Sequence, residues 1–143
     1  MYLIARLSVA ALFAAAISGC GGTGTTDSNQ IGGMVLNADG DTALVARNTG
    51  FVGSAVKVSV VLDGQKVASL GNNEVGSFRA SPGKHTVGLD FEGVELFVKT
   101  NTITYDNDPD RPQYFVITLK KAVGGSTFSI AEVSESSFAS FLN

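Results

Sequence analysis

The stretch that decides the fold is Val56-Lys57-Val58-Ser59-Val60-Val61-Leu62-Asp63-Gly64, in the middle of the 143-residue chain. Its apolar residues recur at every second position and share one face of a β-strand, whereas Lys57 and Ser59 take the other face. Asp63-Gly64 then suits a tight turn, because both residue types tolerate the backbone conformations that turns require. The stretch therefore predicts a half-buried strand that ends in a hairpin.

The same alternation continues through most of the chain, and turn residues separate the runs. Gly71-Asn72-Asn73 marks one turn, Ser81-Pro82-Gly83 suits a type II turn, and Glu92-Gly93 marks a third. Strands at such short spacing are typical of an antiparallel β-sandwich or small barrel. We predict an all-β, antiparallel β-sandwich of about eight strands. These are expected at 42–47, 56–62, 66–70, 75–80, 86–91, 94–104, 114–119 and 127–133.

Only the C-terminus has a helical pattern. Ser134 can cap a helix, and Glu135 suits the positive end of the helix dipole. Phe138, Phe141 and Leu142 fall on one stripe of that helix. The stripe either packs on the sandwich or presents a docking face for a partner, and solvent exposure of the two rings would separate these alternatives.

Residues 1–19 have the three zones of a secretory signal peptide. Arg6 and the amino terminus supply positive charge, an apolar stretch of eleven residues runs from Leu7 to Ile17, and small residues follow. That stretch is too short for a membrane-spanning helix, which needs about 20 apolar residues. We expect residues 1–19 to be removed.

The signal ends in Ile17-Ser18-Gly19-Cys20, and Cys20 is the only cysteine of the chain. This motif resembles the lipobox of bacterial lipoproteins, which implies cleavage before Cys20 and acylation of its thiol. Two or three acyl chains make attachment practically permanent, because each buried methylene contributes about 0.8 kcal/mol. The expected anchor is thus a covalent lipid on Cys20, with no other cofactor and no metal. Gly21 stands where an Asp would resemble the inner-membrane retention signal, so the resemblance favours an outer membrane, facing the periplasm, if the cell is Gram-negative.

Residues 20–33 are expected to form the lipidated cysteine and a flexible tether. Residues 21–30 contain no large apolar side chain and are rich in Gly and Thr, so they bury too little surface to order themselves. Thirteen Gly-rich residues span roughly 20 Å, which would keep the domain near the bilayer. Residues 34–143 suit one domain.

The charge of the chain is mildly acidic. The formal net charge is −3, and loss of Arg6 with the signal leaves about −4. This balance argues against nucleic acid as a partner and against electrostatic adhesion to anionic lipid headgroups. Because the lone cysteine is consumed by the lipid, the exported domain has no disulfide and depends on its core for stability.

The segments Val58 to Ala68 and Ser81 to Val87 combine a strand ending in Asp-Gly, a returning strand, and a Pro-Gly-x-His turn. This arrangement resembles PEGA and carboxypeptidase-regulatory-like domains of bacterial envelope proteins, and a related lipoprotein family of unknown function. The full Pro-Glu-Gly-Ala motif of the first group is absent. The resemblance implies a small β-sandwich accessory module with no catalytic residues to transfer.

His85 is the only histidine and therefore the only side chain that could serve as a typical catalytic base. It shares strand parity with Val87 and Leu89, which places it at the margin of the core. We expect a structural role, so that His85→Gln costs stability while leaving any activity intact.

The segment Tyr105 to Pro112 carries aspartates at alternate positions, Asp106, Asp108 and Asp110. Such spacing suggests a calcium loop, but Arg111 stands where the turn glycine of that loop is needed. A Pro-bearing acidic turn between strands is the simpler interpretation, and Asn37-Ala38-Asp39-Gly40-Asp41 has the same ambiguity.

These features predict a non-catalytic binding or assembly module, anchored to the membrane through acylated Cys20, with an envelope protein or glycan as partner. One alternative is a carrier that holds an apolar ligand between the sheets. Another is an envelope glycan hydrolase that uses Asp106, Asp108 or Asp110.

Overall fold

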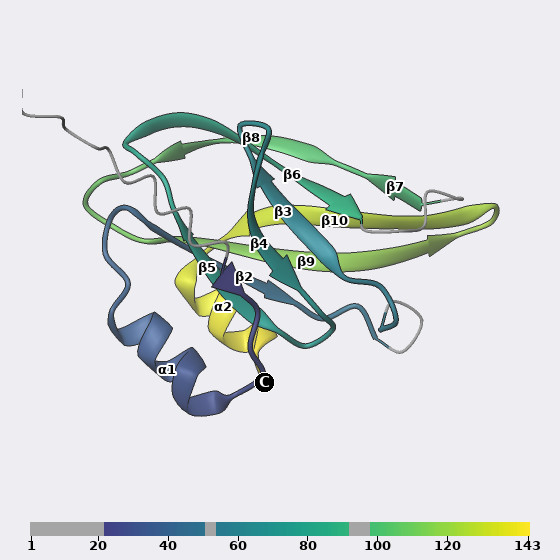
Figure 1. Cartoon of the computed structure of the whole chain (residues 1–143), viewed down its shortest axis with the longest axis horizontal. Helices are drawn as coiled ribbons and strands as arrows, with labels where there is room; N and C mark the ends of the chain where they lie inside the picture. The colour runs from purple at the N-terminus through teal and green to yellow at the C-terminus, as the bar shows by residue number, and fades with distance from the viewer. Residues whose placement is uncertain (1–21, 51–53, 92–97) are drawn as a thin grey trace, which may run out of the picture.

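The computed structural model describes residues 22–50, 54–91 and 98–143, which form two five-stranded sheets packed face to face (Figure 1). Sheet A has the order β1 (Gly22–Thr23), β4 (Gln65–Leu70), β3 (Val58–Leu62), β6 (Gly83–Phe91) and β8 (Thr102–Asn107). Sheet B has the order β5 (Val75–Arg79), β2 (Thr42–Arg47), β9 (Gln113–Ala122), β10 (Gly125–Val133) and β7 (Val98–Thr100). The predicted all-β sandwich is confirmed.

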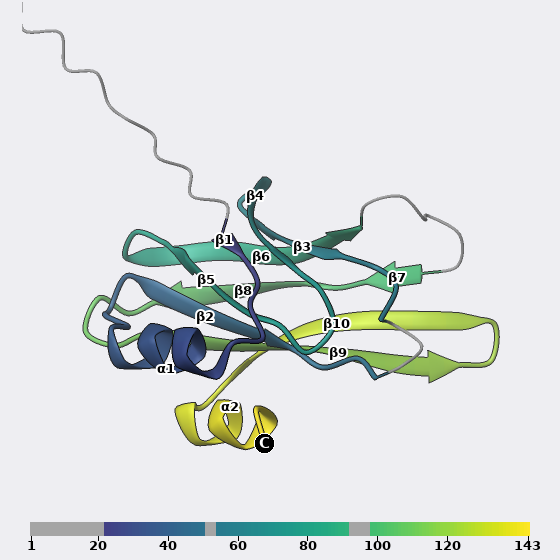
Figure 2. The same cartoon turned by 60° about the horizontal axis from the view of Figure 1, so that its bottom comes forward.

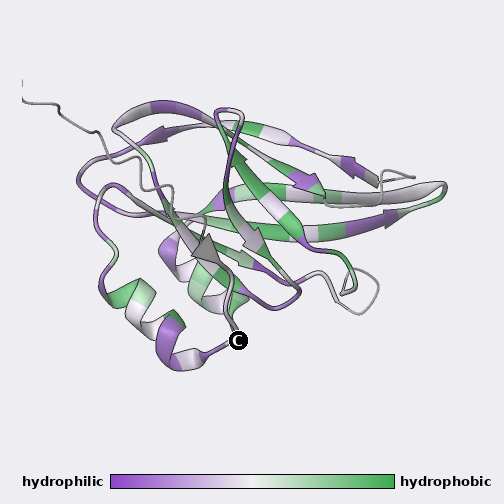
Figure 3. Cartoon of the chain, viewed as in Figure 1, coloured by the Kyte–Doolittle hydropathy of each residue, from purple (hydrophilic) through white to green (hydrophobic). Residues whose placement is uncertain are grey.

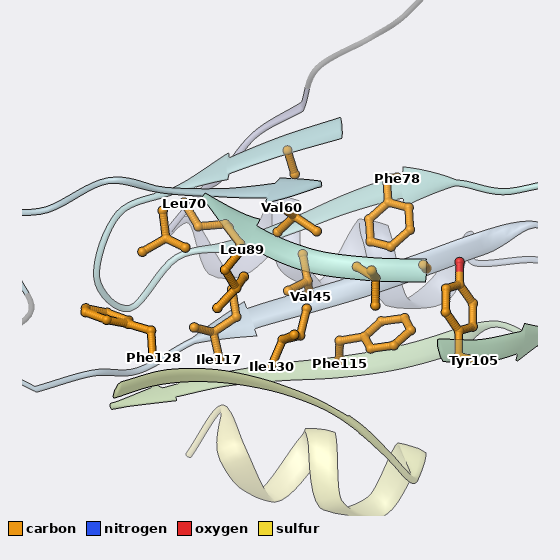
Figure 4. Close-up of a cluster of buried hydrophobic side chains, with 14 residues drawn as sticks. Val45, Val60, Leu70, Phe78, Leu89, Tyr105, Phe115, Ile117, Phe128 and Ile130 are labelled. Carbon is orange, nitrogen blue, oxygen red and sulfur yellow. The ribbon is translucent and has the colours of Figure 1, made fainter. Parts of the chain in front are cut away.

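The core fills the space between the sheets with the inward residues of each strand, and Figure 3 shows the hydrophobic and polar bands that alternate along the strands. Aromatic rings contact each other at both ends of this layer. Tyr105 meets Phe115 edge to face with ring centroids 4.9 Å apart, and Phe91 meets Phe128 at the same separation. Figure 4 shows side chains from the two sheets converging. The members that it labels are Val45, Val60, Leu70, Phe78, Leu89, Tyr105, Phe115, Ile117, Phe128 and Ile130.

Two helices, α1 (Ser28–Leu36) and α2 (Glu135–Phe141), cover the outer face of sheet B. Ser134 accepts a hydrogen bond from the Ser137 amide, as its predicted capping role requires. Phe138 lies over Tyr114 with ring centroids 5.2 Å apart and is only 2% exposed. The aromatic stripe of the C-terminal helix is therefore packed on the protein's own sheet.

The Asp63-Gly64 turn has the geometry that its sequence predicts. Asp63 has φ +48° and Gly64 has φ +84°, the pair of positive values that a two-residue type I′ hairpin needs. Gly83, with φ +112°, likewise takes a conformation that favours glycine after Pro82. These turns bring the ends of β3, β4 and β6 together.

Strand pairing differs from the purely antiparallel prediction. Five of the described strand pairs are antiparallel, but β2–β9, β10–β7 and β1–β4 are parallel. The expected strand at 94–104 is also divided: β7 belongs to sheet B and β8 to sheet A, with Asn101 between them. The Asn101 side chain donates to the Ile130 carbonyl at 2.9 Å and accepts from the Ile130 amide at 2.7 Å. It thereby replaces a backbone pair where the chain changes sheets.

The expectation of a flexible tether up to Gly33, with the domain beginning at Met34, is wrong for the described part of that segment. Gly22 and Thr23 pair with β4, and Thr25 exchanges two 2.8 Å backbone hydrogen bonds with Val75 of β5. Asp27 then caps α1 by accepting from the Asn29 and Gln30 amides. The helix forms because Ile31, Met34 and Val35 lie on one face and pack against sheet B. Residues 22–36 therefore belong to the folded domain.

Candidate functional site

Cys20 and the signal peptide at 1–19 lie outside the described residues, as does the expected turn at Glu92-Gly93. The described chain begins two positions after Cys20, at Gly22 of β1. None of the helices in the described ranges is both long and apolar enough to cross a bilayer. The predicted lipidation site is thus adjacent in sequence to a strand of sheet A.

His85 lies near the start of β6 and joins the turn before that strand to the Asp63-Gly64 turn between β3 and β4. Its Nδ1 is 2.6 Å from Asp63 Oδ2 and its Nε2 is 2.7 Å from the Ser81 carbonyl oxygen. Asp63 Oδ1 also accepts a hydrogen bond of 2.8 Å from the Thr86 amide. The ring packs against Tyr105 with centroids 5.9 Å apart, and its side chain is 13% exposed. Its place at the margin of the core is as expected.

The two partners of His85 favour its charged form. A carboxylate and a carbonyl both accept, so both ring nitrogens must donate, which only the imidazolium can do. The hydrogen bond to Asp63, followed by that to Ser81, raises the pKa of His85, while desolvation opposes the change. The same bond lowers the pKa of Asp63. An imidazolium held this way is a turn clamp and lacks the lone pair that a general base needs.

Tyr105 lies beneath the clamp but adds no acid–base group at neutral pH. Burial raises its pKa to about 12, and its hydroxyl has no hydrogen-bond partner among the described residues. The ring serves as a core residue that supports His85 from below.

The two acidic segments singled out in the sequence meet at one end of the sandwich. A Cβ at Gly40 would overlap the Pro109 carbonyl oxygen, so the 37–41 segment lies directly on the 105–112 turn. Arginines engage the carboxylates there: Arg79 Nη1 is 2.7 Å from Asp41, and Arg111 Nε is 3.1 Å from Asp108. Within the described ranges, no three acidic, His or Cys side chains form a group that could hold a metal ion. Asp106 and Asp110 are exposed.

Arg47 is a buried charge that the strand pattern did not reveal. It ends β2, is 1% exposed, and its Nη1 donates to the carbonyls of Val56 at 2.5 Å and Leu70 at 2.7 Å. Its guanidinium also lies 5.4 Å from the centroid of the Phe128 ring. Desolvation lowers the pKa of Arg47. The sequence sign of this buried charge was an arginine at the end of an otherwise apolar strand. Its hydrogen bond to Leu70 of β4 links sheet B to sheet A.

Within the described ranges no helix lies over the outer face of sheet A, in contrast to that of sheet B, although Ser59 of β3, which alternates with the core residues, is only 1% exposed. A shallow hollow of about 470 Å³ lies over β4, β3, β6 and β8. Glycines, threonines, charged side chains and the apolar Val61 and Leu89 line it. Lys66 Nζ lies 3.8 Å from Asp90 Oδ2 within it. We call this surface the open face; its residues are Val61, Gly64, Lys66, Thr86, Gly88, Leu89, Asp90 and Thr102.

A scan of the chain against models of known protein families found no match, and searches against curated proteins and solved structures found none either.

Proposed function

We propose that this protein is a lipid-anchored envelope lipoprotein whose β-sandwich serves as a non-catalytic binding or assembly module. The observation that carries the proposal is the motif Ile17-Ser18-Gly19-Cys20 at the end of an eleven-residue apolar stretch. A folded domain that includes Gly22, two positions after Cys20, is compatible with it. The PEGA-like turn arrangement at 58–68 and 81–87 is compatible with such a module.

The described polar side chains support a binding role better than a catalytic one. His85 is committed to Asp63 and Ser81, and Asp108 is engaged by Arg111. A glycan hydrolase needs two carboxylates placed across a scissile bond, whereas Asp106, Asp108 and Asp110 follow one another on a single strand end and turn. The helix-covered side of sheet B is a broad surface on which such a partner could bind.

A carrier of an apolar ligand between the sheets receives less support from the packing. Fourteen buried side chains fill the layer between the sheets, and rings from opposite sheets touch at 4.9 Å. A ligand there would have to displace close-packed side chains, which costs several kcal/mol.

The proposal is tested by replacing Cys20 with Ser and comparing cell fractions with those of wild type and of Thr26→Ser, a control that leaves the anchor unchanged. We expect wild type and Thr26→Ser in the membrane fraction, with an N-terminal peptide whose mass includes acyl chains. The Cys20→Ser protein should leave that fraction, because a single residue carries the attachment. Unchanged fractionation without acylation would contradict the lipid anchor.

A second part of the same experiment tests whether the β-sandwich binds a partner. Crosslinking in intact cells should recover an envelope protein or glycan with wild type and Thr26→Ser, and much less of it with Cys20→Ser. Recovery of no partner from the anchored protein would contradict the binding role.

A further inference from the structure

The distance from the anchor to the folded domain is set by covalent geometry. Cys20 precedes Gly22 by two positions, and consecutive Cα atoms are about 3.8 Å apart, so Cys20 lies within about 8 Å of the start of β1. An acylated Cys20 would have to sit at the membrane interface. This reach is far shorter than the roughly 20 Å of a thirteen-residue tether.

The first strand is held firmly enough to transmit that constraint. Gly22 and Thr23 pair with Ala68 and Ser69 of β4, and the Gly24 amide donates to the Ser69 carbonyl at 2.8 Å. Thr25 then pairs with Val75 in sheet B. Gly24 packs so closely against Leu70 and Glu74 that a Cβ there would clash with both. The chain is therefore bound to both sheets within four residues of the start of β1.

The position of β1 selects the side of the molecule that faces the lipid. In Figure 2 sheet A lies uppermost, sheet B lies beneath it and α2 lies below sheet B, with α1 beside β2. Both helices pack on the apolar cluster at the outer face of sheet B. β1 belongs to sheet A and runs parallel to β4, so its first residue points back toward Lys66 and the Asp63-Gly64 turn. Because packed sheets lie about 10 Å apart, the helices are separated from sheet A by more than the reach of the anchor.

The open face has the chemistry of a surface that rests on headgroups without penetrating the hydrocarbon. Lys66 and Lys84 on the outer side of sheet A are balanced by Asp90 and Asp106. Thr86 and Thr102 add exposed hydroxyls, and Gly88 keeps the surface flat. Within the described residues the open face contains no exposed large apolar side chain, whereas Leu36, Val123 and Leu142 are exposed elsewhere. A balanced, hydroxyl-bearing face suits a predominantly zwitterionic lipid surface.

From these observations we infer that the open face lies against the headgroups of the bilayer that holds Cys20, with the helix-covered side of sheet B directed away from it. The inference rests on the proposed acylation of Cys20 and adds an orientation to it. It leaves the helix-covered face and the sandwich ends accessible to an envelope partner.

Single introduced thiols test this orientation, because Cys20 is the only natural cysteine and acylation blocks it. Thr86→Cys on the open face and Ser136→Cys on α2 are matched probes, since both replace small exposed hydroxyl residues. Each full-length gene is expressed, and the membrane-extracted protein is labelled with a fluorophore. It is then placed in phosphatidylethanolamine vesicles with a minor fraction of phosphatidylglycerol, containing a headgroup-attached spin label.

We expect the spin label to quench the fluorophore at position 86 several-fold more strongly than that at position 136. Gln65→Cys, exposed at the start of β4, should be quenched as strongly as position 86. Equal quenching at 86 and 136 would overturn the inference. Strong quenching at 65 alone would overturn it as well, because the sandwich would then stand on its β1–β4 edge.

A longer anchor provides the control. Inserting about twelve Gly and Ser residues between Gly21 and Gly22 adds roughly 20 Å of reach. Membrane attachment should persist while the difference between positions 86 and 136 disappears; a persistent difference would show that the short anchor does not set the orientation. The mass of the N-terminal peptide separates the two proposals. Acylated protein with equal quenching refutes the orientation alone, whereas protein without acyl chains refutes the anchor and the orientation together.

Discussion

In both sheets successive side chains point alternately into the core and outward, but the outward side chains of the two sheets differ in polarity. On sheet B the outward positions of β2 and β9 are apolar, including Leu44, Tyr114 and Val116, and they require the cover that α1 and α2 provide. On sheet A the outward positions of β6 and β8 carry Thr, Gly, Lys and Asp, and no helix of the described ranges covers them. A strand that is apolar on both faces thus indicates that a further layer, here the helices, packs on its outer side, whereas a strand that is apolar on one face indicates a solvent-facing outer side.

The largest expected effect comes from removing the centre of the covered face. Phe138→Ala should lower the free energy of unfolding by about 3 kcal/mol, because a ring that is 2% exposed and packed on Tyr114 leaves a cavity. Thr104→Ala, exposed on sheet A, should change it by less than about 0.5 kcal/mol. Urea denaturation measures both. Similar losses would mean that the two faces do not differ as described.

The same contrast exists within α1, whose two sides can be compared directly. Ile31 packs toward sheet B and Leu36 is 86% exposed. Ile31→Ala should cost about 1–2 kcal/mol of stability, since its side chain is half-buried, and Leu36→Ala close to zero. Equal effects of the two substitutions would indicate that α1 is not docked in solution.

In sheet A, the contacts of His85 with Asp63 and Ser81 are expected to contribute to the free energy of unfolding. His85→Gln should cost about 1–2 kcal/mol at about pH 6, because it removes a charge-assisted hydrogen bond between the two turns. The pKa of His85 is raised in the folded state. Its contribution is therefore fully present below the unfolded value of about 6.5 and is lost as pH rises through the raised value.

Denaturation midpoints from about pH 6 to about pH 8.5 check this prediction. The difference between the denaturation midpoints of wild type and His85→Gln should become smaller as the pH rises. The lowered pKa of Asp63 adds a second loss at the acid end, because stability from that carboxylate falls as pH drops through the lowered value. A gap that stays constant across the neutral range would exclude the imidazolium.

The smallest expected effect is an increase in the free energy of unfolding. Ser59 alternates with the core residues Val58 and Val60, and its Oγ is buried without a hydrogen-bond partner among the described residues. Ser59→Ala removes a desolvated hydroxyl and should raise the free energy of unfolding by up to about 1 kcal/mol. A loss of stability would instead point to a hydrogen bond through bound water.

Much of the sheet architecture could be predicted, because period-two patterns and turn residues act locally. The strand at Thr42–Arg47 and the Asp63-Gly64 hairpin have the predicted positions. The parallel pairing of β2 with β9 could not be predicted, since it joins residues far apart in the chain. The sheet change at Asn101 depends on a side-chain contact with Ile130 that no periodicity reveals.

The N-terminal segment shows how composition can hide a helix. The Gly- and Thr-rich residues before Asp27 indicated a coil, yet Asp27 is a typical cap and Ile31, Met34 and Val35 have helical spacing. The position of His85 at the margin of the core was predictable from its strand parity. Its partners Asp63 and Ser81 were not, because they belong to turns brought together only by the fold.

The crossing of residues 22–25 from β4 to β5 has a consequence for molecules held on a surface. Lipid-anchored proteins diffuse in two dimensions and meet repeatedly in similar orientations, so an unpaired strand edge would invite pairing between neighbours. Here β1 occupies the edge of β4, and Thr25 takes both a donor and an acceptor of Val75 on β5. If Cys20 is acylated as proposed, residues 22–25 therefore also protect this side of the sandwich from strand pairing with neighbouring copies.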